Sequence, residues 1–130
     1  MTRARRILHR PGWAGLLAVL LFAAAGSAGE LPADEGRLIE ALIARVAGMS
    51  DAAFIRNDRS YDAATAAEFL RRKWRRHADE VRSVEDFIER VASGSSTTGM
   101  PYRIRLADGR ELPCAAVLRE ELGKLRKHAP

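Results

Sequence analysis

Cysteine is almost absent from this chain of 130 residues, in which Cys114 is the only one. An internal disulfide needs two cysteines, so none can form. The thiol follows Pro113 at the start of an expected helix, where the positive helix end would lower its pKa. A lone cysteine is more often a small buried apolar residue. The role of Cys114 therefore stays open at this stage.

Histidine is scarce too, and only His77 and His128 follow the first 28 residues. Neither is placed as the base that a serine nucleophile needs. Lys73 forms no S-x-x-K motif with Ser95 or Ser96. The two histidines and the cysteine also lack the spacing of zinc ligands. These absences argue against an enzyme and predict no metal and no cofactor, so a serine hydrolase using Ser95 or Ser96 is the weakest of three functional hypotheses.

Acidic residues are missing from the start of the chain, where the first one is Glu30. Four arginines are followed by an uncharged run over residues 13–25 and by small residues up to Gly29. This order predicts a secretory signal peptide over residues 1–28, cleaved near Ala28 by the general secretory route, and therefore an exported protein. The exact cut can shift by one or two residues. No cysteine follows the run, which excludes a lipoprotein.

The apolar run is too short for a permanent anchor. Its 13 residues span about 20 Å as a helix, against a hydrocarbon core of about 30 Å. We therefore expect no stable membrane anchor after cleavage. Cleavage also removes four of the 22 basic residues, which leaves 18 against 17 acidic ones and a net charge of +1. A general attraction to nucleic acid thus belongs to the discarded segment, and nucleic acid is not an expected partner.

Residues 29–130 are long enough for one small globular domain, with its core over about 34–126. Apolar spacings of three and four predict helices over 34–47, 62–77, 83–94 and 115–126. Alternation over 102–106 and the turn Asp108-Gly109 predict a hairpin with a brief return strand at 111–112. Residues 53–56 are β-like and could add a third strand. The expected fold class is α+β, mainly helical, with four helices and a small antiparallel hairpin sheet between the third and fourth.

A cluster of polar residues could bind a small anion or another small ligand. A loop rich in hydroxyl and N–H donors follows the third helix, and two cations could lie beside it. The alternative is structural, with serines capping the helix end and the cations bound to the loop. The negative end of the helix dipole favours that alternative. The candidate residues are Arg56, Asn57, Lys73, Ser95, Ser96, Thr97 and Tyr102.

Four arginines share the exposed side of the second helix: Arg71, Arg72, Arg75 and Arg76. Glu68 is placed to pair with Arg72 at i,i+4. A solvated face is the simplest interpretation, and an envelope protein with an acidic surface is the next. The leading hypothesis is a non-enzymatic interaction module of the cell envelope, and the oligomeric state is left open.

Four stretches stand out in order along the chain: F-I-R-N at 54–57, A-A-E-F-L-R-R-K at 66–73, V-E-D-F-I-E-R-V-A-S at 84–93 and S-S-T-T-G-M-P-Y at 95–102. Together they resemble the YfeK-like family of small periplasmic proteins of Gram-negative bacteria, a domain of unknown function. The resemblance implies one small periplasmic domain and no catalytic residue. The family usually has glycine after R-N, where this chain has Asp58. If that turn requires positive φ, aspartate is less favourable there than glycine.

Overall fold

The computed structural model describes residues 30–129, so the signal peptide expected over 1–28 lies outside the described residues. The elements follow in the order α1 (Ala33–Ala47), β1 (Ala53–Arg56), β2 (Arg59–Tyr61), α2 (Ala63–Arg76), a 3-10 turn η2 (Ala78–Glu80), α3 (Val84–Asp86) continued by a π-helix η3 (Phe87–Ala92), β3 (Arg103–Arg105), β4 (Glu111–Pro113) and α4 (Cys114–Lys127). The fold is therefore α+β and mainly helical, as expected.

The sheet has four antiparallel strands in the order β2-β1-β3-β4. β3 and β4 form the predicted hairpin after the third helix, with Ile104 opposite Leu112. The expectation that the sheet lies between the third and fourth helices was incomplete, because β1 and β2 come from between α1 and α2. Phe54 of β1 joins the two hairpins, since it lies opposite Tyr61 on one side and Ile104 on the other.

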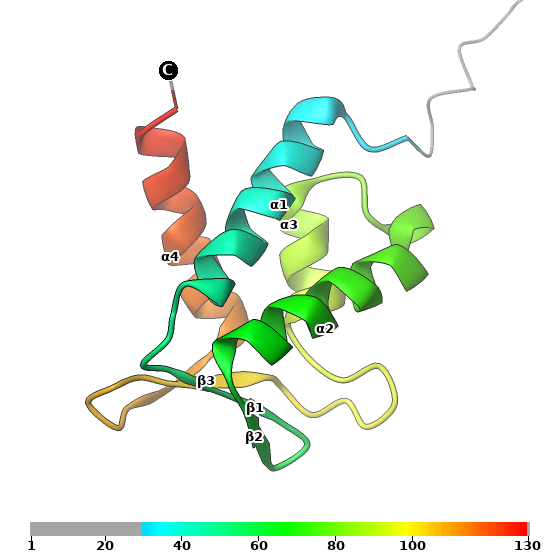
Figure 1. The fold of residues 1–130 in the computed structure, drawn as a ribbon. Helices are drawn as coiled ribbons and strands as arrows, with labels where there is room; N and C mark the ends of the chain where they lie inside the picture. The colour runs from blue at the N-terminus through cyan, green and yellow to red at the C-terminus, as the bar shows by residue number, and fades with distance from the viewer. Residues whose placement is uncertain (1–29, 130) are drawn as a thin grey trace, which may run out of the picture.

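All the helices gather on one side of this sheet (Figure 1). The core between them has its largest fully buried side chains on α1, on η3, at Ile104 of β3 and at Leu118 of α4. Apolar spacing explains why α1 forms, since Ile39, Leu42, Ile43 and Val46 are all buried on one stripe. The helices therefore cover the inner face of the sheet, and any site on that face is framed by helical side chains.

The turn between β1 and β2 has positive φ at both central residues, 48° at Asn57 and 63° at Asp58. This is the pattern of a type I′ hairpin turn, which matches the twist of two antiparallel strands. Positive φ is unfavourable for a residue with a Cβ, although Asn and Asp tolerate it best. Because Asp58 has a positive φ, glycine would be more favourable than aspartate at this position.

Asp58→Gly is expected to raise the free energy of unfolding by about 0.5–1 kcal/mol, because relief of the left-handed conformation exceeds the entropy that glycine adds to the unfolded chain. Urea unfolding measures the change. Asp51→Gly is the matched control, since Asp51 is exposed in a turn without positive φ. It is expected to be neutral or destabilising, and equal stabilisation by both variants would contradict the explanation.

Candidate functional site

Lys73 is the most unusual side chain of the described domain, because it is 3% exposed. Its position follows from the helical repeat, which places residue 73 on the stripe of Ala66 and Leu70. Lys73 was expected as a cation beside the loop, and its burial was not predicted. A buried ammonium requires partners for its donors.

The Lys73 ammonium binds the segment that leads into β3. Its Nζ donates hydrogen bonds to the Gly94 carbonyl oxygen at 2.6 Å and to the Tyr102 hydroxyl at 3.0 Å. It also lies 4.7 Å from the centre of the Tyr102 ring. Over residues 30–129 no carboxylate lies within salt-bridge distance of this nitrogen. Burial, with the nearby charges of Arg56 and Arg76, lowers the pKa of Lys73 to about 8.

The loop after the third helix, residues 95–99, is held by hydrogen bonds between its own residues. The Ser95 hydroxyl accepts from the Thr98 N–H at 3.2 Å and meets the Thr97 hydroxyl at 3.1 Å. Thr98 in turn donates to the amide oxygen of Asn57 at 2.8 Å, which ties the loop to the β1–β2 turn. These contacts match the structural alternative for Ser95 and Asn57. Ser96 and Thr97 are exposed.

Arg56 lies apart from that loop, because strand alternation directs it to the helix-covered face. Residues 54 and 56 share one face of β1, and Phe54 is buried there. The Arg56 guanidinium sits 4.2 Å from the centre of the Phe69 ring on α2. Phe69 meets Tyr102 edge to face at 5.8 Å. Lys73 thus contacts the loop and Tyr102, whereas Arg56 contacts Phe69. Tyr102 links the two groups, because it meets Phe69 and lines the same pocket as Arg56.

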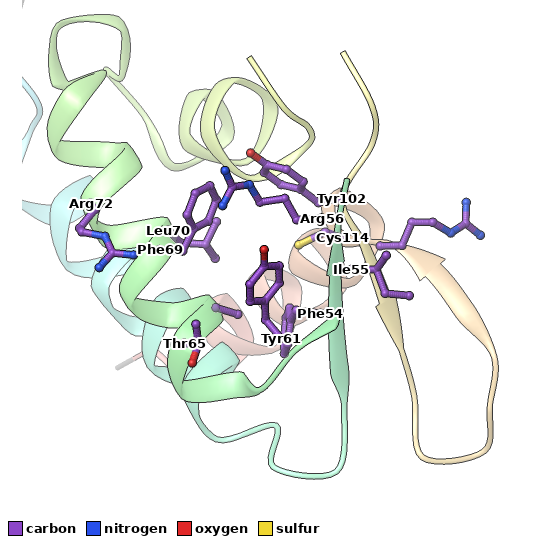
Figure 2. A pocket seen from close by; sticks show the side chains of 12 residues that line it. Phe54, Ile55, Arg56, Tyr61, Thr65, Phe69, Leu70, Arg72, Tyr102 and Cys114 are labelled. Carbon is purple, nitrogen blue, oxygen red and sulfur yellow. The ribbon is translucent and has the colours of Figure 1, made fainter. Parts of the chain in front are cut away.

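A pocket of about 90 Å³ lies beside Arg56, between α2 and the inner face of the sheet. Figure 2 shows its aromatic walls and the Arg56 side chain reaching across toward Phe69 and Tyr102. The main wall residues are Phe54, Tyr61, Ala66, Phe69, Tyr102 and Cys114. Sequence reasoning missed this pocket, and the shared strand face of Phe54, Tyr61 and Tyr102 was the available signal.

Cys114 forms part of the pocket wall and is 2% exposed. Burial raises the pKa of its thiol to about 12. The expectation that the start of a helix would lower this pKa was therefore wrong, because burial outweighs the helix end. A thiol of this kind is inert at neutral pH and acts as an apolar wall residue.

The arginines of α2 differ in their partners. Arg71 binds Glu40 of α1 at 3.0 Å. Arg72, Arg75 and Arg76 are exposed, and over residues 30–129 they form no ion pair. Within residues 30–129, Arg72 does not form the ion pair with Glu68 that their spacing suggested. Three cations on one helix are thus left facing solvent.

Two further features, a metal site and a membrane-spanning helix, were sought in residues 30–129. His, Cys, Asp and Glu side chains there form no group of three that could hold a metal ion. None of the helices over residues 30–129 combines the length and apolar character needed to cross a membrane. The fold and site define a small α+β domain with a basic helix face and one apolar pocket beside it.

The chain belongs to the family described as Family of unknown function (DUF5329), whose model matches residues 33–126. It is also 36% identical over 70 residues to "Uncharacterized protein YfeK" of Salmonella typhimurium (strain LT2). That alignment covers 54% of this chain and 58% of the relative, so it spans little more than half of each. The resemblance to the YfeK-like family is confirmed. No solved structure matches the chain.

Proposed function

We propose that this chain is a non-enzymatic binding module that docks on an acidic envelope protein through the basic face of α2, formed by Arg71, Arg72, Arg75 and Arg76. The observation that carries the proposal is that three of these four arginines, all except Arg71, have no acidic partner within residues 30–129. Most other described arginines have an acidic partner, as Arg45 has Glu121 and Arg126 has Glu85.

Grouping separates this face from the remaining unpaired arginines. Arg56, Arg59, Arg82 and Arg119 also form no ion pair within residues 30–129, but no two of them share an element: Arg56 lies on β1, Arg59 on β2, Arg82 between η2 and α3, and Arg119 on α4. Three unpaired cations within five residues of one helix create a local positive field that a partner of opposite charge would meet. Arg75 and Arg76 lie in the last turn of α2, where the negative helix end stabilises cations and offsets only part of their charge.

The proposed compartment is the periplasm of a Gram-negative bacterium, reached through the signal peptide expected over residues 1–28. That segment has basic, apolar and small-residue regions in the order that secretion requires. In an envelope setting the partner is a protein with an acidic patch, and the basic face supplies orientation and association rate more than raw affinity.

Charge reversal of Arg72→Glu with Arg76→Glu is expected to reduce capture of the partner at least tenfold after cross-linking in living host cells, because both faces would then be acidic. The tagged protein is purified from periplasmic extract, and its intact mass should be that of a chain that begins at Gly29. Capture without cross-linking should fall in 1 M salt, where the Debye length is about 3 Å.

The matched control is Arg82→Glu with Arg119→Glu, which makes the same change of net charge outside α2. It should capture the same partner as the original protein. Equal capture by both double variants would contradict docking through α2, as would a partner that binds equally well in high salt.

A further inference from the structure

The pocket between α2 and the sheet has an apolar interior of a size suited to a short hydrocarbon chain. Its volume is about 90 Å³, smaller than the roughly 150 Å³ cavity that accommodates benzene in another protein. Thr65 and Arg72 also line it and are exposed, so the pocket opens to solvent. An occupant would place its apolar part against aromatic rings and its polar part at this opening.

The polar groups at the rim are cationic. Arg56, Arg72 and Arg103 line the pocket, and no acidic side chain of the described residues does. Arg103 is neutralised by Glu111 at 3.2 Å. Arg56 has no acidic partner within residues 30–129 and makes its described contact with the Phe69 ring.

The N–H donors of Arg56 are available to a ligand. Within residues 30–129 its guanidinium lies 4.2 Å from the centre of the Phe69 ring and donates no hydrogen bond to another residue. Those donors match the two oxygens of a carboxylate, which arginine binds through parallel hydrogen bonds. Lys73 adds positive charge behind the wall, because its ammonium donates to the Tyr102 hydroxyl at 3.0 Å.

From this apolar interior and cationic rim we propose that the pocket binds a small aliphatic carboxylate. Its apolar chain of about four or five carbons, fewer than the six of benzene because the pocket is smaller, lies between Phe54, Tyr61 and Phe69, and its carboxylate binds Arg56. This site goes beyond the docking role of α2, because the carboxylate binds Arg56 of β1, and Arg72 is the one arginine of the basic face that also lines the pocket. Binding can therefore succeed or fail independently of the partner.

The experiment titrates the purified domain with 4-methylpentanoate and follows backbone amide signals by NMR. The expected result is a saturable shift of the amides around Arg56, Tyr61 and Phe69. 4-Methylpentanamide has the same chain without the charge, and acetate has the charge without the chain. Each should bind at least tenfold more weakly than 4-methylpentanoate, because the pocket uses both parts of the ligand.

Arg56→Gln and Arg103→Gln form a matched pair, since both remove one cation from the pocket rim. Arg56→Gln should weaken binding of the acid at least tenfold and leave the amide unchanged, whereas Arg103→Gln should change either by less than threefold. No saturable shift with the acid would overturn the proposal. So would equal binding of acid and amide, or equal loss in the two variants, because each would remove the role of Arg56.

Discussion

Replacing Phe87 by alanine is expected to lower the free energy of unfolding by about 3–5 kcal/mol, the usual cost of removing a large aromatic side chain from a core. Phe87 is fully buried and meets the Trp74 ring edge to face at 5.9 Å. It therefore joins η3 to α2. A domain of this size has a total stability of about 5–15 kcal/mol, so the variant loses a large fraction of it.

Urea or thermal unfolding measures this loss, with Glu89→Ala as the control. Glu89 belongs to the same helical segment, is exposed and has no ion pair over residues 30–129. Its replacement should change stability by no more than about 0.5 kcal/mol. A cost below about 1 kcal/mol for Phe87→Ala would mean that the ring is not part of the core.

Helices were the most predictable part of this fold, because their signals lie within a few residues. Ser83 and Asp86 provide such a signal at the start of the third helix, where the Ser83 hydroxyl accepts from the Asp86 N–H at 3.1 Å. The change to a π-helix from Phe87 was not predicted. A π-helix adds less than one residue to each turn, and the buried residues Phe87, Ile88 and Val91 fit the expected apolar face equally well.

Strand β2 was missed because Arg59, Ser60 and Tyr61 are too few and too polar to show alternation. The available signal was the preceding pair Asn57-Asp58. Two residues that accept positive φ favour a hairpin turn, and a hairpin requires a return strand. Local turn chemistry thus contained information that the hydrophobic pattern did not.

The candidate site was only partly predictable, because the predicted residues contact partners in the fold that the sequence did not indicate. The sequence placed Arg56 and Lys73 in one cluster, whereas β1 directs Arg56 to Phe69 and α2 directs Lys73 to Gly94. The pocket depends on the spacing between α2 and the sheet, which the side chains of both set together. That spacing is a tertiary property with no short-range signal.

The stability of the domain is expected to rise between pH 8 and pH 9, then level off and fall above about pH 10. Lys73 has a folded pKa of about 8 against an ordinary 10.5. Between these values the unfolded chain binds more protons, so stability rises with pH by at most about 1.4 kcal/mol per unit. Urea unfolding at a series of pH values measures this profile.

The contribution of Cys114 to the pH dependence of stability has the opposite sign. Its folded pKa of about 12 exceeds the ordinary 9.0, so from pH 9 the unfolded chain loses this proton first and stability falls with a similar slope. The two slopes cancel above pH 9. Burial also raises the pKa of Tyr102 above its ordinary 10.0, which adds a second falling contribution from about pH 10.

Two variants separate these contributions, because each removes one titrating group. Lys73→Met should lose the rise between pH 8 and pH 9 and then fall from pH 9, whereas Cys114→Ala should continue to rise until about pH 10. An original protein whose stability is flat from pH 8 to pH 9 would show that Lys73 reaches solvent. In that case its ammonium would no longer be held between Gly94 and Tyr102.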